Sequence, residues 1–285
     1  MTGIHEPVFY QFDQSRTEES KNNYHLSLQI GIDGFCFALF HLQERKYIGI
    51  GEYAIKNNST IKLEELIQSI LESDTWLKGS FKSVSVSLEQ PKNTLIPSAL
   101  FDENQLNNYF SINTGKHQIE GATFDLLLQT ETVNCYEADK DLCKLISRYH
   151  PAASFSHQTS VSIESAAQAA YKGSTIHLQF NRTSIDLTAF KEGKLQLQNR
   201  FNYKTSEDVI YYLLYVMEQL SISQEETLLS ISGNIVKDSN VYQLLYKYIK
   251  EIKLEELPTH VDYSQPLRLA EPHQYYLLIQ QYLCA

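Results

Sequence analysis

The chain has 285 residues, enough for one large domain or two domains of ordinary size, and 42% of them are hydrophobic, as in folded rather than disordered proteins. Its formal net charge of −10 excludes nucleic acid and anionic membrane surfaces as expected partners. No hydrophobic run approaches the roughly 20 residues that span a bilayer, and the N-terminal residues lack the features of a secretory signal, so we expect a cytoplasmic protein without membrane insertion.

The first half of the chain follows the order β-β-β-α-β. Alternating hydrophobic residues predict its strands, and Asp33-Gly34 between the first two strands is typical of a hairpin turn. After the third strand, hydrophobic residues recur at helical spacing, and Glu64 and Glu65 favour the first turn of that helix. The predicted elements are strands over 24–32, 35–40 and 46–55, a helix over 60–77 and a strand over 84–88.

The second half repeats this order. Its first helix is expected to begin at Thr205, because Asp208 follows at the spacing of a capping box. An offset of 150 residues without gaps matches Leu28-Gln29-Ile30 with Leu178-Gln179-Phe180. The predicted elements are strands over 176–180 and 185–190, a strand from 193, the helix from 205, a strand over 228–231 and a helix over 238–250. Two such halves predict two related α/β lobes with a cleft between them.

Extra elements separate the two halves. They are a helix over 101–110, a strand over 124–129, a helix over 138–149, a strand over 153–157 and an Ala-rich helix over 161–171. The amphipathic stretch from His273 to Leu283 is expected to pack back on a lobe. We therefore predict a first lobe with inserted elements over 1–172, a second lobe over 173–270 and a C-terminal helix within 271–285.

The segment from Glu164 to Phe190 carries the most informative pattern. Glu164-Ser165 precedes an Ala-rich stretch ending at Tyr171, and a strand and a tight turn then lead to Ser184-Ile185-Asp186-Leu187-Thr188. This order resembles the superfamily of actin, sugar kinases and heat-shock chaperone ATPases. In the chaperone branch, a helix beginning Glu-Pro ends in Ala-Tyr-Gly, and a glycine-rich turn that binds phosphate precedes an Asp-Val-Ser strand.

Two further segments carry the same resemblance. Leu95-Ile96-Pro97, followed by Phe101-Asp102-Glu103, is similar to the segment after the fourth strand in pilus-assembly members, and Ser232-Gly233-Asn234 stands at the place of the adenosine-binding turn. The whole chain also resembles an uncharacterised bacterial family of unknown function with an actin-like ATPase fold. The resemblance implies an α/β fold of two ribonuclease-H-like lobes, with a nucleotide site in the central cleft.

The turns that should hold phosphate depart from the superfamily pattern. Glycine lets backbone N–H groups approach phosphate oxygens closely. In the second half, Asn181, Arg182 and Thr183 replace the three glycines, and Gln179 stands at the metal-associated Asp. In the first half, Asp33-Gly34 runs directly into the next strand, so the loop is shortened and its hydroxyl is absent. Both departures argue against ATP hydrolysis.

Five residues would contact a nucleotide if such binding survives: Asp33, Gly34, Arg182, Thr183 and Gly233. Asp33 and Gly233 also have structural explanations. Asp33 fits an ordinary Asp-Gly hairpin turn, and Gly233 fits a turn from a strand into a helix. Arg182 could meet a phosphate electrostatically. By its position in the superfamily fold Glu164 could be a catalytic acid, although a solvated carboxylate in the first turn of a helix is the alternative. We assign no catalytic residue and no metal ligand.

Three functions are compatible with these observations. The first is a non-catalytic protein of actin-like fold without a cofactor, acting as an interaction or regulatory module for a protein partner. The second is a divergent ATPase or small-molecule kinase that binds ATP with Mg²⁺ in the cleft. The third is a polymerising scaffold of actin-like fold, which the fold alone suggests.

Overall fold

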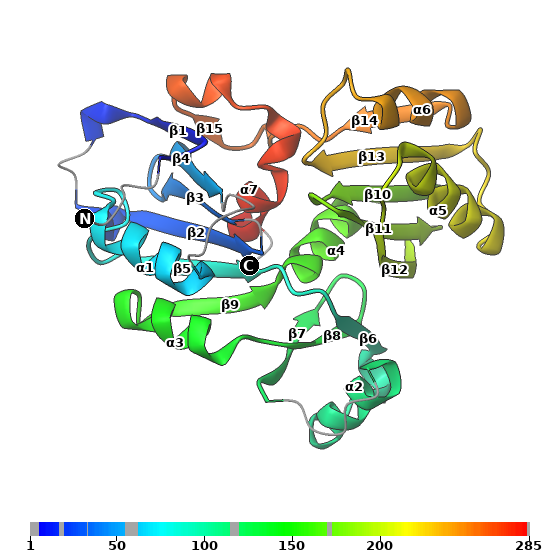
Figure 1. Cartoon of the computed structure of the whole chain (residues 1–285), viewed down its shortest axis with the longest axis horizontal. Coiled ribbons are helices and arrows are strands. Elements are labelled where there is room, and N and C mark those ends of the chain that lie inside the picture. Colours follow the sequence, from blue (N-terminus) through cyan, green and yellow to red (C-terminus); the bar gives the residue numbers. More distant parts are fainter. Residues whose placement is uncertain are drawn as a thin grey trace.

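A computed structural model describes residues 6–16, 20–32, 34–54, 62–114, 120–169 and 173–283. The chain forms two α/β lobes, each on its own β-sheet, and a small third sheet lies beside the first lobe (Figure 1). Two helices, α4 (Gln158–Ala169) and α7 (Tyr276–Leu283), lie between the two large sheets. The predicted two-lobe α/β fold is confirmed.

The first lobe is built on a sheet with the strand order β1-β4-β3-β2-β5-β9, and β15 pairs with β4. Helices α1 (Leu63–Ser73) and α3 (Lys140–Tyr149) cover one face with hydrophobic side chains, while the segment ending in α7 covers β3 and β4 on the other. The strands are β1 (Phe9–Phe12), β2 (Tyr24–Gly31), β3 (Gly34–His41), β4 (Lys46–Ala54), β5 (Ser83–Leu88), β9 (Ala153–His157) and β15 (Asp262–Tyr263).

The second lobe has the strand order β12-β11-β10-β13-β14, with α5 and α6 over its outer face. The capping box predicted at the start of α5 is present, because Asp208 N–H donates to Thr205 Oγ1 at 3.2 Å and Thr205 N–H donates to the Asp208 carboxylate at 2.9 Å. The elements are β10 (Ser174–Phe180), β11 (Ser184–Lys191), β12 (Lys194–Asn202), α5 (Ser206–Gln219), β13 (Thr227–Gly233), α6 (Asn240–Tyr248) and β14 (Glu251–Leu254).

The strand register confirms the internal repeat predicted at an offset of 150 residues. The β3–β4 pair shifts register between Leu39 and Phe40. The β11–β12 pair shifts register between Ala189 and Phe190, at the matching positions of the second lobe. Register shifts at matching positions are unexpected from chance pairing, so the second hairpins of the two lobes, β3–β4 and β11–β12, are equivalent structures.

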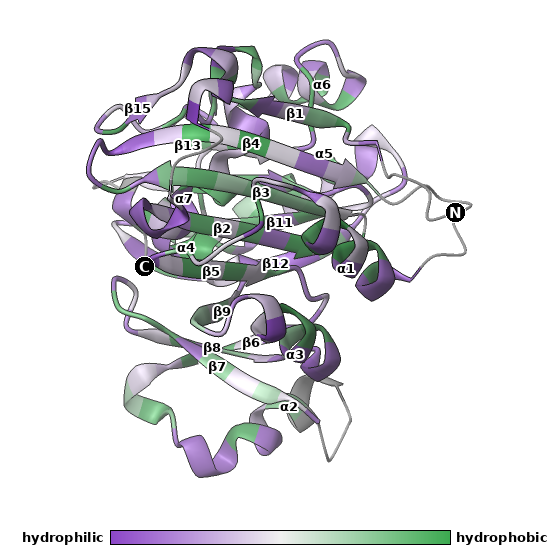
Figure 2. Ribbon diagram, turned by 90° about the vertical axis from the view of Figure 1, so that its left-hand side faces the viewer, coloured by the Kyte–Doolittle hydropathy of each residue, from purple (hydrophilic) through white to green (hydrophobic). Residues whose placement is uncertain are grey.

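The small sheet has the order β6-β8-β7 and is covered by α2 (Figure 2). Its elements are β6 (Asn93–Pro97), α2 (Leu106–Thr114), β7 (Ala122–Leu127) and β8 (Thr132–Glu137). The sequence predicted only one of its strands and placed the start of its helix too early. The strands β1, β14 and β15 were also not predicted, because each has only two to four residues, too few to show a period of two.

Helix α4 begins at Gln158, three residues before the predicted start. The carboxylate of Asp125, on β7, accepts hydrogen bonds from His157 N–H at 2.8 Å and Ser160 Oγ at 2.6 Å. The Thr159 N–H of the first turn donates to His157 Nδ1 at 3.0 Å, so His157 caps the helix, and Asp125 holds this capping turn from another strand. The small sheet therefore fixes the start of the helix that runs between the lobes.

The sheet faces that meet α4 and α7 mix polar and hydrophobic side chains. On β10, Leu178 and Phe180 pack in the outer core, whereas the alternate residues His177 and Gln179 lie on the inner face. The ring centroid of His177 lies 6.1 Å from that of Tyr276 on α7. The outer hydrophobic cores of the two lobes are separate, and the layer between the sheets combines polar groups with smaller hydrophobic clusters.

Buried histidines predict that the protein loses stability in mild acid. Burial lowers the pKa of His25, His150 and His157 to about 4, from a usual value near 6.5. The unfolded chain therefore binds more protons than the folded one between these two values, and stability falls as the pH decreases from 6.5 to 4. Urea unfolding at pH 7.5, 5.5 and 4.5 should show this slope, which the His25→Gln variant should reduce.

Candidate functional site

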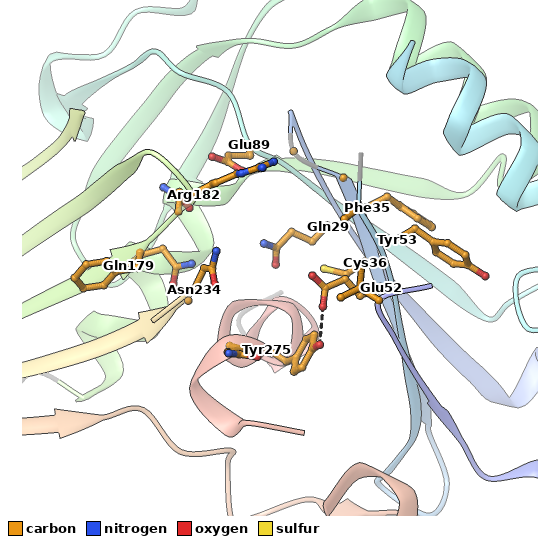
Figure 3. A pocket seen from close by; sticks show the side chains of 18 residues that line it. Gln29, Phe35, Cys36, Glu52, Tyr53, Glu89, Gln179, Arg182, Asn234 and Tyr275 are labelled. Carbon is orange, nitrogen blue, oxygen red and sulfur yellow. Dashed lines mark hydrogen bonds between the residues drawn. The ribbon is translucent and has the colours of Figure 1, made fainter. Parts of the chain in front are cut away.

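A cavity of about 500 Å³ lies between the lobes, where the hairpins and strand ends of both sheets converge (Figure 3). We call it the cleft. Its main lining residues are Gln29, Gly31, Gly34, Cys36, Glu52, Tyr53 and Glu89 from the first lobe, Gln179, Phe180, Asn181, Arg182, Gly233 and Asn234 from the second, and Gln274 and Tyr275 from the segment before α7. The volume is within the range of small-molecule sites.

The structure brings together three of the five residues predicted to contact a nucleotide. Gly34, Arg182 and Gly233 line the cleft. Thr183 is exposed and is not a lining residue. Asp33 lies outside the described residues. Nucleotide contact by these residues stays a prediction, but the geometry of each turn indicates what it can bind.

The turn of the second lobe uses its polar groups internally. Asn181 N–H donates to Ser184 O at 2.9 Å, which closes the hairpin. The Asn181 side chain donates to Asp186 at 2.9 Å and accepts from Gln158 at 3.2 Å. The Asn181 N–H group is therefore not directed at a ligand, and a side-chain amide occupies the place where a glycine would leave space for phosphate.

The turn of the first lobe lies against a carboxylate. Gly31 pairs directly with Gly34 at the end of the hairpin. A Cβ atom on Gly31 would overlap the Glu89 carboxylate, which follows β5. Gly34 has φ +151°, and a Cβ there would overlap the backbone oxygen of Tyr53. Close packing against backbone thus explains Gly34, and an anion at this turn would meet the negative charge of Glu89.

Gly233 also has a structural explanation. Its φ is +88°, and a Cβ atom would overlap the Phe180 carbonyl oxygen. The following residue, Asn234, donates its N–H to the same oxygen at 2.8 Å. Gly233 therefore allows the chain to turn from β13 toward the next helix while it stays hydrogen-bonded to β10. This structural role accounts for the glycine without a ligand.

A buried ion pair joins the two lobes next to the cleft. Arg200 on β12 donates to both carboxylate oxygens of Asp186 on β11, at 2.6 and 2.7 Å, and lies 3.4 Å from Glu89 of the first lobe. The Asp186 side chain is 2% exposed, and Arg200 and Glu89 are 15% and 16% exposed. Sequence reasoning missed Arg200 and Glu89, because they lie 111 residues apart and neither belongs to a motif.

Two glutamines at equivalent positions of the repeat face one another across the cleft. Gln29 and Gln179 point toward each other from the two lobes (Figure 3). Gln179 is 5% exposed, and its Oε1 accepts a hydrogen bond from Ser232 Oγ. His177 Nε2 lies 2.9 Å from the same hydroxyl. Among the described residues, neither Gln29 nor the Nε2 group of Gln179 has a hydrogen-bond partner, so both amides are available to a ligand.

A carboxylate without a cationic partner lies at the other end of the cleft. Tyr275 donates its hydroxyl to Glu52 Oε2 at 2.6 Å. Burial, together with the charge of Glu52, raises the pKa of Tyr275. Within the described part of the chain, no Lys, Arg or His side chain lies within 4 Å of the Glu52 carboxylate. Burial raises the pKa of the neighbouring Cys36 thiol well above its usual value, so this thiol is a poor nucleophile.

Glu164 does not line the cleft, although its position in the superfamily made it a candidate acid. It lies in the middle of α4 rather than in a first turn, because the helix begins at Gln158. Its carboxylate accepts a hydrogen bond from Gln129 N–H at 3.3 Å, and burial raises its pKa. The expectation of a solvated first-turn carboxylate is therefore wrong.

The described residues contain no group of three or more His, Cys, Asp or Glu side chains placed to hold a metal ion. None of the helices in the described ranges has the length and hydrophobicity needed to cross a bilayer.

Comparisons with known proteins agree with this architecture. A family model described as "Protein of unknown function (DUF3822)" matches residues 13–252. A solved structure from Bacteroides thetaiotaomicron VPI-5482, a protein with an actin-like ATPase fold and unknown function, is 25% identical with a TM-score of 0.73 over 82% of this chain and 91% of that chain. No curated protein matches.

A more distant structural neighbour is the PilM-PilN type IV pilus biogenesis complex. It is 9% identical, with a TM-score of 0.55 over 91% of this chain and 97% of that chain. At this identity the similarity concerns the fold alone. Together the two structures confirm the actin-like ATPase fold that the sequence implied.

Proposed function

We propose that this chain, which belongs to the DUF3822 family of proteins of unknown function, is a non-catalytic module of actin-like fold that binds a protein partner rather than ATP. The observation that carries the proposal is the state of both hairpin turns. Asn181 directs its N–H into the second turn, and the Glu89 carboxylate lies against the first. The Asn181 N–H is thus used within its hairpin, and an anion at the first turn would meet the Glu89 carboxylate, so neither arrangement favours phosphate.

The charges of the cleft support the same conclusion. Glu52 and Glu89 line the cleft, and Gln29 and Gln179 present side-chain amides from the two lobes. A triphosphate placed there would meet carboxylates of its own sign. A two-lobe fold without its phosphate-binding turns can still position a binding surface, since fold does not fix function. The PilM-PilN complex is a precedent for this fold within a protein assembly.

Calorimetric titration with Mg-ATP at millimolar concentration tests the proposal, and we expect no saturable heat. Arg182 lines the cleft and is the described cation that could meet a phosphate there. Saturable binding that Arg182→Ala or Asp33→Asn weakens would overturn the proposal in favour of a divergent ATPase or kinase. A Lys237→Ala variant, with an exposed lysine that does not line the cleft, is the control.

A further inference from the structure

We propose that the cleft takes a basic side chain of the protein partner, with its guanidinium or ammonium group at Glu52 and its flanking peptide groups between Gln29 and Gln179. This inference rests on the proposed function, since it names the chemistry of the partner for the same cleft. It follows from the charge of the cleft, from the groups left without partners and from their arrangement.

The first argument is charge. Glu89 shares the ion-pair cluster of Arg200 and Asp186, whereas Glu52 accepts only the neutral hydroxyl of Tyr275 among the described residues. Figure 3 shows Arg182 and Glu89 toward one end of the cleft, and Glu52 with Tyr275 toward the other. A partly buried carboxylate without a cation is stabilised by a ligand that supplies one. The chain's net charge of −10 would also attract a basic partner.

The second argument is the unused hydrogen-bonding capacity of the glutamines. Gln179 is 5% exposed, and the Ser232 hydroxyl fixes its Oε1, so its Nε2 group is directed into the cleft without a described partner. The side-chain amide of Gln29 faces it from the other lobe. A buried amide donor without a partner favours a ligand that brings an acceptor. A peptide carbonyl supplies that acceptor, and a peptide N–H can bond the amide oxygen of Gln29.

The third argument is the positioning of these groups. His177 bonds Ser232 at 2.9 Å through Nε2 and Ser230 at 2.9 Å through Nδ1. When His177 donates from Nε2, the Ser232 hydroxyl donates to Gln179, and the Gln179 amide presents its NH₂ group to the cleft. His177 and Ser232, which lie behind the cleft, thus determine that Gln179 offers a donor rather than an acceptor to the ligand. At about 500 Å³ the cleft has room for one side chain and its adjoining peptide groups.

The test compares two blocked peptides, acetyl-Gly-Arg-Gly-amide and the same peptide with citrulline in place of arginine, by calorimetry on the full chain. Citrulline keeps the shape and hydrogen-bonding groups but removes the charge. We expect saturable binding of the arginine peptide and at least about tenfold weaker binding of the citrulline peptide. Equal binding of the two peptides, or no binding of either, would overturn the inference.

Matched variants locate the effect. Glu52→Gln keeps an acceptor for Tyr275 but loses the charge. It should weaken binding of the arginine peptide about tenfold and leave binding of the citrulline peptide unchanged. Gln29→Leu should weaken both peptides alike. Glu251→Gln removes an exposed carboxylate from β14, at the end of the strand away from the cleft, and should change neither. An unaltered arginine affinity in Glu52→Gln would contradict the placement.

The two proposals fail separately. Saturable Mg-ATP binding would overturn the proposed function whatever the peptides do. Absence of both ATP and peptide binding would overturn the basic-side-chain inference alone, and the partner would then bind another surface.

Discussion

Replacing Asp186 by Ala should lower the free energy of unfolding by about 3–5 kcal/mol. The substitution leaves the Arg200 guanidinium, 15% exposed, without the two charge-assisted hydrogen bonds that hold it at 2.6 and 2.7 Å. A buried charge without its partner costs much more than the pair itself contributes. Urea unfolding followed by circular dichroism measures the loss.

An exposed ion pair provides the control for this prediction. Glu225 and Lys250 lie 3.5 Å apart with side chains that are 77% and 68% exposed. Glu225→Ala should change stability by at most about 1 kcal/mol, since solvent screens such pairs. If Asp186→Ala costs no more than Glu225→Ala, then water reaches Arg200 and the Asp186–Arg200 pair does not stabilise the β11–β12 hairpin.

Truncating equivalent leucines of the two lobes should destabilise one lobe at a time. Leu28 and Leu178 are both 0% exposed and occupy matching positions of the repeat, each in the core of its own lobe. Leu28→Ala and Leu178→Ala should each cost about 2–5 kcal/mol. Because the two leucines belong to separate hydrophobic clusters, we expect each substitution to lower the midpoint of a different transition in scanning calorimetry.

Tryptophan fluorescence distinguishes the two lobes. The chain has one tryptophan, and Trp76 lies in the first-lobe core, 2% exposed and stacked on Phe12 at 4.8 Å. The midpoint of unfolding followed by Trp76 fluorescence should decrease in Leu28→Ala and stay unchanged in Leu178→Ala. Equal shifts in both variants would show that the lobes unfold as one cooperative unit.

Periodic hydrophobicity and the repeat predicted both lobes because these features are local. The match of Leu28 with Leu178 predicted two equivalent hairpins, and the next hairpin of each lobe has a register shift at matching positions. The small sheet was largely missed, since β6 and β8 pair through contacts about 40 residues apart, as between Asn93 and Tyr136. Such pairing has no signature in the sequence of either strand.

The sequence predicted where the cleft lies, but not which charged and polar side chains line it. The missing glycines pointed to the two turns, and Gly34, Arg182 and Gly233 do line the cleft. Glu52 and Glu89 were not identified, because a single Glu in or after a strand has no distinguishing context. Their shared location in the cleft follows only from the way the two sheets face each other.

The closed β10–β11 turn also makes this molecule a scaffold for reconstruction. The β10–β11 turn is short and its tip, Arg182 and Thr183, is exposed, so a longer glycine-rich loop could be grafted there while the strands keep their register. A chimera of this kind, with and without Gln179→Asp, would separate what loop backbone and metal-binding carboxylate each contribute to nucleotide affinity.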